Sequence, residues 1–251
     1  MERIADEAAL VSWVRQLQDA AVPHGECLLT VPFAARMSDA QLRTRLDLML
    51  HRTQRRAFQL RRRRDGTLHL GITLSLRDGI RMARTSAAEL PTREQWALAI
   101  AREMADSALA LPDEAARFRY LFDCLAMRVR YLDHRPGDAA RANVVSACGA
   151  LVDGRANCQG FADAYWLLCT LAGLEADYQL GYAGSSAHAW NLIRIGEAWY
   201  AADVSRASRL LRTEGEGAMD RAFAMDISAA RALGLRWEAG LETHVIIGGQ
   251  A

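Results

Sequence analysis

The sequence contains no lysine, and all 31 of its basic residues are arginine. No side chain of this chain can therefore form a Schiff base or serve as an amine acceptor, so chemistry that needs a lysine must take it from the substrate. Basic and acidic residues nearly cancel, with a formal net charge of +1. This balance argues against nucleic acid or an anionic membrane as a partner.

Long apolar runs and a hydrophobic leader are also missing. No stretch approaches the roughly 18 apolar residues of a membrane span. The first residues, MERIADEAALVSWVRQL, carry scattered charges and indicate an amphipathic helix rather than a signal peptide. We therefore expect a cytoplasmic protein with no membrane partner, unless a leader has been removed.

Cysteine is scarce, and its spacing excludes common metal and redox motifs. The five cysteines lie too far apart for a CxxC site or a zinc ribbon, and no HExxH motif or acidic calcium loop is present. We expect no metal and no cofactor. Cys27, Cys124, Cys148 and Cys169 are expected to pack as small hydrophobes.

Two regions of the chain differ in pattern. Residues 1–112 mix strand-like and helical runs, and the Asp65-Gly66 pair predicts a hairpin there. From residue 113 onward the sequence begins with an amphipathic helical run, and the residues with visible chemistry follow it. We therefore expect an N-terminal mixed α/β region over residues 1–112 and a catalytic domain over residues 113–251, with its motif core at residues 113–206.

Cys158 lies where a helix is expected to begin. Residues 154–157, GRAN, indicate a loop, and Asn157 is a favoured N-cap residue. Apolar residues then recur at three- and four-residue spacing up to Gly173, a typical helix end. Free N–H groups and the helix dipole stabilise an anion at such a start, which favours a reactive thiolate. The alternative is a cysteine that simply packs at a helix start.

A hairpin is expected downstream of this helix. The runs AHAWNLIRI and AWYAADVS predict two strands, and the Gly-Glu pair at residues 196–197 suits a two-residue type II′ turn. Such a turn pairs Ile195 with Ala198. This pairing sets the register of the whole hairpin.

In that register His188 lies opposite Ser205, and Trp190 lies opposite Asp203. Because side chains alternate along a strand, all four project to the same side of the sheet. His188 and Asp203 become diagonal neighbours, with Cβ atoms roughly 7 Å apart, so their side chains can meet. A three-residue turn would separate them. The alternative is a histidine and an aspartate satisfied in an ordinary sheet.

A thiol, an imidazole and a carboxylate in this arrangement fit nucleophilic catalysis. Asp203 accepts a hydrogen bond from His188 and favours the imidazolium form. His188 deprotonates Cys158 and later protonates the leaving group. We therefore predict these three residues as the catalytic set.

Other groups near Cys158 are candidates for contacting the substrate or its oxyanion. The backbone N–H of Cys158 is the natural first oxyanion donor. The Tyr131 hydroxyl is a candidate second donor, against the simpler interpretation of a core tyrosine. Trp190 is predicted beside His188 on the catalytic face, and Gln159 is expected to point to solvent or a neighbouring loop.

Three blocks of the sequence resemble motifs of the transglutaminase-like superfamily, in a bacterial form. They are Gly-x-x-x-Cys-x-Gly-Phe-Ala at residues 154–162, His-Ala-Trp-Asn at residues 188–191 and Trp-Tyr-x-x-Asp at residues 199–203. The resemblance covers residues from about 113 to 206. It implies an α+β fold with a papain-like core, in which the nucleophile lies at a helix N-terminus packed against an antiparallel sheet.

The resemblance also implies a Cys-His-Asp triad at Cys158, His188 and Asp203 and a thioester intermediate. Hydrolysis of a peptide or amide bond, as by a peptidase or amidase, is the expected outcome, with a peptide, protein or small amide as substrate. One alternative is a transglutaminase or another amide-forming acyltransferase. The other is a catalytically inactive binding module of the same fold. The sequence does not indicate an oligomeric state.

Overall fold

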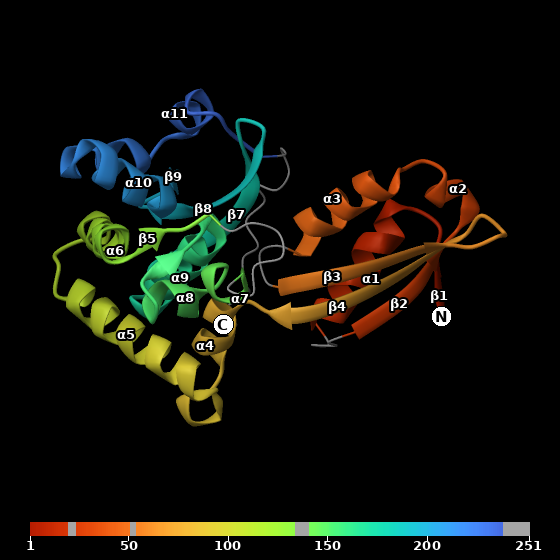
Figure 1. The fold of residues 1–251 in the computed structure, drawn as a ribbon, viewed down its shortest axis with the longest axis horizontal. Coiled ribbons are helices and arrows are strands. Elements are labelled where there is room, and N and C mark those ends of the chain that lie inside the picture. The colour runs from red at the N-terminus through yellow and green to blue at the C-terminus, as the bar shows by residue number, and fades with distance from the viewer. Residues whose placement is uncertain (20–23, 51–53, 134–140, 238–251) are drawn as a thin grey trace. The chain divides into compact units, whose positions relative to one another are not determined.

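The computed structural model describes residues 1–19, 24–50, 54–133 and 141–237. The chain divides into two compact units, Met1–Arg77 and Asp78–Ala251, and each has its own sheet and helices (Figure 1). The boundary predicted at residue 112 lies within the second unit. It falls between two helices that pack against each other.

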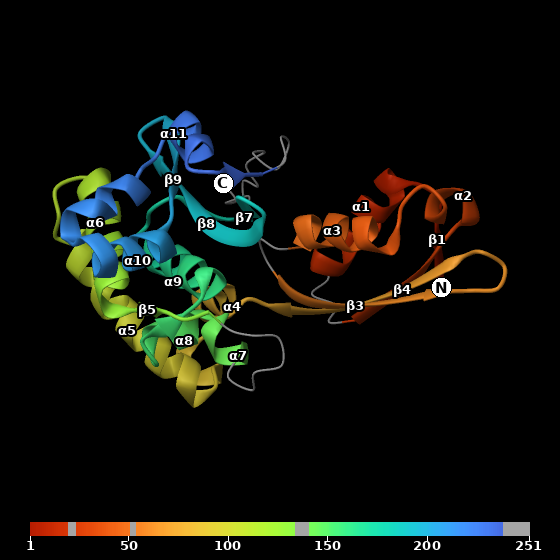
Figure 2. The ribbon, with the colours of Figure 1, turned by 45° about the horizontal axis from the view of Figure 1, so that its top comes forward.

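The first unit is a sheet covered by helices. Its elements are β1 (Glu2–Ile4), α1 (Glu7–Asp19), β2 (His24–Leu29), α2 (Val31–Ala34), α3 (Asp39–Leu50), β3 (Gln54–Arg62) and β4 (Leu68–Leu76). The strand order is β1-β2-β4-β3, with β1 parallel to β2 and the other pairs antiparallel. Helices α1 and α3 lie on the same side of this sheet (Figure 2).

The core of the first unit lies between those helices and the sheet. It is built from Leu10, Trp13, Cys27, Leu29, Leu42, Leu46, Leu68, Leu70 and Ile72. The predicted hairpin around Asp65-Gly66 is confirmed, because it joins β3 to β4 and Gly66 has φ +81°. Glycine adopts this left-handed conformation without the strain that a Cβ adds.

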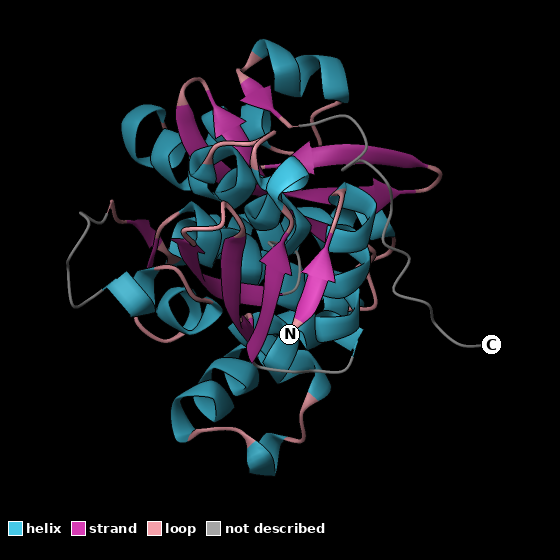
Figure 3. Ribbon diagram, turned by 90° about the vertical axis from the view of Figure 1, so that its right-hand side faces the viewer, coloured by secondary structure: helices cyan, strands magenta, loops and turns pink. Residues whose placement is uncertain are grey.

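The second unit contains the chemistry-bearing segments. Its helices are α4 (Asp78–Arg84), η1 (Ala87–Glu89), α5 (Thr92–Leu109), α6 (Glu114–Arg128), α7 (Arg141–Val144), α8 (Ala147–Leu151), α9 (Cys158–Leu171), α10 (Val204–Glu214), η2 (Glu216–Ala222) and α11 (Ile227–Ala232). Its strands are β5 (Arg130–Tyr131), β6 (Arg155–Ala156), β7 (Ala176–Ala183), β8 (Ser186–Ile195), β9 (Ala198–Ala202) and β10 (Leu235–Arg236). Figure 3, in which helices are cyan and strands are magenta, shows that the chain contains both.

Helix α9 lies at the centre of the second unit (Figures 1 and 2). Its sequence, CQGFADAYWLLCTL, is apolar on nearly every side, which is typical of a buried helix. One side packs against β7 and β8, and the others contact α4, α5, α6, α8 and α10. The buried hydroxyl of Tyr165 donates to the Phe118 carbonyl oxygen at 3.0 Å. Helix α9 is therefore packed on several sides within this unit.

The sheet beside α9 has the strand order β10-β7-β8-β9, and all of its pairs are antiparallel. The predicted α+β fold, with a cysteine helix packed against an antiparallel sheet, is confirmed. Within the described residues, no helix is both long and apolar enough to cross a bilayer.

Candidate active site

Cys158 is the first residue of α9, as predicted. The preceding Asn157 is extended, and its Oδ1 accepts hydrogen bonds from the backbone N–H of Gln159 at 3.0 Å and of Gly160 at 3.2 Å. This cap uses the second and third N–H groups of the helix. The N–H of Cys158 itself has no acceptor among the described residues. It is therefore available to bind an anion near the thiol.

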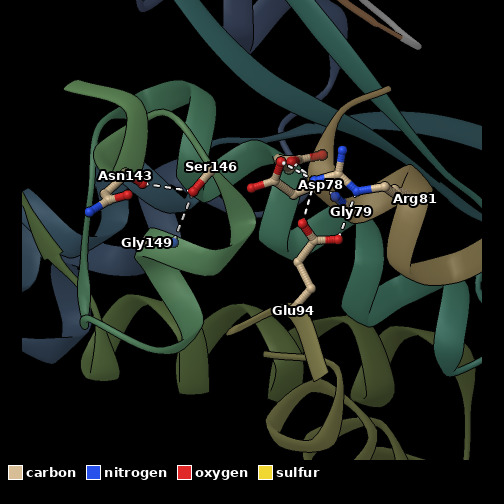
Figure 4. A network of polar contacts seen from close by, with 8 residues as sticks. Asp78, Gly79, Arg81, Glu94, Asn143, Ser146 and Gly149 are labelled. Carbon is tan, nitrogen blue, oxygen red and sulfur yellow. Dashed lines mark hydrogen bonds and ion pairs between the residues drawn. The ribbon is translucent and has the colours of Figure 1, made fainter. Parts of the chain in front are cut away.

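The loop ahead of α9 fits tightly against its first turn. A Cβ at Gly160 would lie 2.5 Å from the Val144 carbonyl oxygen, so only glycine permits this approach. Gly149 is equally restricted, since a Cβ there would lie 1.8 Å from the Asn143 carbonyl oxygen. The Ser146 hydroxyl accepts from the Gly149 N–H at 3.0 Å and donates to the Asn143 carbonyl at 2.8 Å (Figure 4). These contacts fix the loop against the cysteine turn.

Buried charges hold α4 and α5 next to α9. The Arg81 guanidinium lies between Glu94 and Asp78, with its Nε donating to Glu94 Oε2 at 2.7 Å and its Nη2 lying 3.4 Å from Asp78 Oδ1 (Figure 4). Asp163 on α9 accepts from the Gly79 N–H at 3.2 Å. Asp78 and Glu94 are buried, but the Arg81 side chain is 36% exposed, so solvent screens part of the attraction. The network is a support for α9.

The predicted register of the hairpin is confirmed. Ile195 pairs with Ala198, and the pairing continues to Asn191 and Ala202. Gly196 has φ +60°, whereas Glu197 is not among the described residues with positive φ. This combination is the one that a type II′ turn requires.

The second strand ends earlier than predicted. β9 stops at Ala202, and Asp203 is the N-cap of α10, so the expected strand through Ser205 is wrong. Asp203 Oδ1 accepts from the Arg206 N–H at 2.9 Å and from the Ser205 hydroxyl at 2.8 Å. Aspartate is a favoured cap, and here the cap ends the strand. Ser205 therefore binds Asp203 and does not face His188 across a strand pair.

The second oxygen of Asp203 binds His188. Asp203 Oδ2 lies 2.7 Å from His188 Nε2, and the side chains are 1% and 14% exposed. Burial alone would lower the pKa of His188, but the charge and hydrogen bond of Asp203, together with Cys158, raise it from 6.5 to about 10. Burial would raise the pKa of Asp203, but His188 and the helix cap keep it below its usual value. The pair is therefore imidazolium and carboxylate at neutral pH.

The thiol of Cys158 lies within interaction range of both His188 and Tyr131. It contributes to the raised pKa of each of these side chains. Because His188 Nε2 faces Asp203, its Nδ1 is the nitrogen left for the thiol. Tyr131 packs on the apolar cluster that contains Cys158, and β5 pairs it with Ala156. Burial, more than any other cause, raises the pKa of Tyr131, and Cys158 and a hydrogen bond to Asp133 add to it, so the hydroxyl stays protonated and already has Asp133 as an acceptor.

Trp190 and Gln159 are placed less favourably for contacting a substrate than the sequence predicted. Trp190 is 1% exposed, and its ring stacks on His188 with centroids 6.0 Å apart and planes at 22°. It is on the predicted side, but it contacts the histidine from within the core. Gln159 is half-buried, and its N–H is taken by the cap. Its role as a substrate contact stays a prediction.

Sequence reasoning missed Asn191, which ties the sheet to α9. Its side-chain nitrogen donates to the carbonyl oxygens of Ala162 at 3.0 Å and of Asp177 at 3.3 Å. Because side chains alternate along β8, Asn191 lies on the opposite face of the sheet from His188 and Trp190. This alternation is the sequence signal that could have identified Asn191 as a residue facing another element.

The described residues contain no group of three or more His, Cys, Asp or Glu side chains arranged to hold a metal ion. All five cysteines are free thiols. The expectation of no metal and no cofactor stays a prediction. The candidate site is thus a thiol, an imidazole and a carboxylate, with a phenol beside them.

The fold of the second unit defines a papain-like α+β core. Residues 99–204 match the family model of the transglutaminase-like superfamily. The predicted recognition is confirmed. A search of curated proteins gave no match.

Solved structures give weaker likenesses. A structure described as a TGase has 12% identity and a TM-score of 0.42, and the match covers 72% of this chain and half of that one. A proposed cysteine protease from Cytophaga hutchinsonii has 15% identity and a TM-score of 0.35, over 61% of this chain and 67% of that one. The periplasmic domain of TgpA from Pseudomonas aeruginosa has 14% identity and a TM-score of 0.37, over 68% and 71%.

Proposed function

We propose that the chain is a cysteine-dependent acyl-transfer enzyme that hydrolyses a peptide or amide bond with Cys158, His188 and Asp203 as its triad. The observation that carries the proposal is the 2.7 Å contact between His188 Nε2 and Asp203 Oδ2, next to a cysteine at the first residue of the central helix. The match of residues 99–204 to the transglutaminase-like superfamily model supports it.

The reactive state pairs the Cys158 thiolate with the His188 imidazolium, whose Nδ1 carries the proton that the thiol has given up. The resulting imidazolium is held by Asp203, which accepts from Nε2 and is itself fixed by the α10 cap. The thiolate lies at the start of α9, where the helix dipole stabilises negative charge. Asp203 thus keeps one tautomer and one ring orientation.

The thiolate then attacks the carbonyl carbon of an amide, and the C–S bond forms as the C=O electron pair moves to oxygen. We assign the Cys158 N–H as the first donor to this oxyanion and the Tyr131 hydroxyl as the second. When the oxyanion collapses, the C–N bond breaks, and the imidazolium gives its proton to the leaving amine. A thioester remains on Cys158.

Water completes the reaction. His188 takes a proton from water, the hydroxide oxygen attacks the thioester carbon, and the C–S bond breaks to release a carboxylic acid and the thiol. An amine in place of water would give a transglutaminase or another amide-forming enzyme. Because the chain has no lysine, that amine cannot be one of its own side chains. The cytoplasmic location and the substrates (peptide, protein or small amide) remain proposals.

The second candidate function belongs to a different class: a binding module of the same fold that has no catalytic activity. A buried ion pair is a poor way to stabilise a fold, because desolvation offsets much of its attraction. The Asp203–His188 pair is buried and touches a thiol, which favours catalysis over a role in stability alone.

The test of the proposed function is turnover. We would incubate the wild type, Cys158→Ala and His188→Ala with a panel of peptides and glutamine amides, with and without a primary amine, and follow products by mass spectrometry. We expect acid products with the wild type and none with either variant. Amine incorporation in place of hydrolysis supports the transferase, and no Cys158-dependent product supports the binding module.

A further inference from the structure

The last described segment of the chain packs behind the candidate histidine. We call residues 226–237 the C-terminal strap; it contains α11, β10 and Trp237. It lies beyond residue 204, where the match to the superfamily model ends. β10 joins the sheet by pairing Leu235 with Ala183 and Arg236 with Tyr182.

A row of contacting rings connects this strap to His188. The Trp237 ring meets the Trp190 ring edge-on, with centroids 5.6 Å apart and planes at 63°. Trp190 in turn stacks on the His188 ring at 6.0 Å. The Arg231 guanidinium lies 5.5 Å from the Trp237 ring centre and covers it.

Strand β7, which lies between β10 and the strand that carries His188 and Trp190, is shaped to let the strap approach. Gly181 pairs directly with His188. A Cβ at Gly181 would lie 2.2 Å from the Arg236 carbonyl oxygen and 2.7 Å from Trp190 Cη2. Glycine at this position therefore permits both the close approach of β10 and the inward position of the Trp190 indole.

We propose that Trp237 is a positioning residue for His188 and acts through Trp190. The strap holds Trp190 against one face of the imidazole and keeps water from that face. The ring is thereby kept in the orientation that joins the Cys158 thiol to Asp203. A ring held on one face has fewer alternative orientations, and proton transfer is sensitive to displacements of about 1 Å. This inference rests on the proposed function.

The test compares Trp237→Ala and Trp237→Phe with a matched control, Trp96→Ala, in the full chain. Trp96 lies on α5 and is 60% exposed. The readouts are kcat, KM, the pKa of the His188 ring by NMR and the alkylation rate of Cys158. For Trp237→Ala we expect kcat to fall about 10- to 100-fold with KM changed less than about two-fold. Trp237→Phe recovers most of kcat, and Trp96→Ala matches the wild type.

The pKa readout separates positioning from a structural role. Water reaching the ring relieves its burial and screens Asp203, so the pKa of His188 in Trp237→Ala departs from the wild-type value of about 10. A folded variant with only a lower Tm, and with unchanged kcat and His188 pKa, overturns the inference. If Trp237→Ala does not fold, Trp237→Leu, which keeps apolar volume without an aromatic edge, is measured by the same criteria.

The two proposals fail in different ways. If the wild type turns over no substrate, the proposed function fails, whereas the His188 pKa and Cys158 alkylation still decide whether Trp237 positions the ring. If the wild type is active and folded Trp237→Ala behaves like it, only the positioning role is lost. Gly181→Ala, with both tryptophans intact, is expected to displace the strap and to reproduce Trp237→Ala.

Discussion

The carboxylate of Asp203 caps helix α10 and binds the imidazole of His188 at the same time. One oxygen accepts from the Arg206 N–H and the Ser205 hydroxyl, and the other lies 2.7 Å from His188 Nε2. The carboxylate cannot rotate without losing one of these partners. The orientation of the histidine is therefore tied to the start of a helix, which is a more rigid support than a surface loop.

Asp203→Asn is expected to abolish most activity while leaving the fold intact. The amide oxygen can keep the cap, but its NH₂ group cannot accept from His188 Nε2, so the ring changes tautomer. We expect kcat to fall about 10³- to 10⁴-fold. The pKa of His188 falls from about 10, because the charge of Asp203 that offsets the burial of the ring is lost and only Cys158 still raises it. NMR of the ring and steady-state kinetics check this.

The matched control is Asp113→Asn, because Asp113 caps α6 by accepting from the Ala116 N–H at 2.8 Å and has no histidine beside it. It should lose a little stability and no activity. Comparable kcat in the two variants would contradict the role of Asp203.

Stability is expected to depend on pH through the same pair. The pKa of His188 is raised in the folded state, from 6.5 to about 10, so its contribution is complete below pH 6.5 and is lost as the pH rises to about 10. The pKa of Asp203 is lowered, so its contribution is present above pH 3.8 and is lost on acidification below that. In urea unfolding, the free energy of unfolding of the wild type should decrease from pH 6.5 to 10, and His188→Ala should lack this decrease. Parallel curves would show that the pair is not coupled.

Gly160→Ala is expected to disturb the cysteine turn. Its Cβ would meet the Val144 carbonyl oxygen at 2.5 Å, and backbone on both sides limits relaxation. We expect a loss of about 1–3 kcal/mol in the free energy of unfolding, together with reduced activity. Gly217→Ala is the control, since nothing lies within 4 Å of its Cβ. Equal Tm values for the two variants would show that the loop yields easily.

Tyr131→Phe tests the proposed second oxyanion donor. The ring still stacks on Phe161, so packing is kept and only the hydroxyl is lost. We expect kcat to fall about 10²- to 10³-fold with KM nearly unchanged. Tyr165→Phe removes another buried hydroxyl, which binds the Phe118 carbonyl, and should lower Tm without changing kcat. A kcat for Tyr131→Phe within two-fold of the wild type would remove Tyr131 from the mechanism.

Local patterns predicted much of the candidate site. The cap by Asn157, the start of α9 and the hairpin register each depend on a few neighbouring residues, and each agrees with the structure. The strand end at Asp203 was missed, because AADVS reads as a strand and the cap shows only once α10 is known. Local strand propensity gave way there to helix capping.

Contacts between distant segments were beyond the sequence. Trp237 meets Trp190 from far along the chain, and no periodicity links the two. The boundary of the second unit could not be predicted for the same reason. Helices α4 and α5 belong to this unit through contacts of Arg81, Glu94 and Asp163, which lie far apart in the sequence. Burial of Trp190 was hidden for the same reason: the strap that covers it is not visible in the hairpin pattern.

The most direct test of the account is the rate at which iodoacetamide alkylates each cysteine at pH 6 to 7, read by mass spectrometry. Cys124 is the internal reference, because it is more exposed than Cys158, which is 8% exposed. Partial burial raises the pKa of the Cys124 thiol. The account predicts that Cys158 reacts first despite its burial, and that His188→Ala removes this advantage. If Cys124 reacts faster in the wild type, or if His188→Ala leaves the rate at Cys158 unchanged, the activated thiol is contradicted.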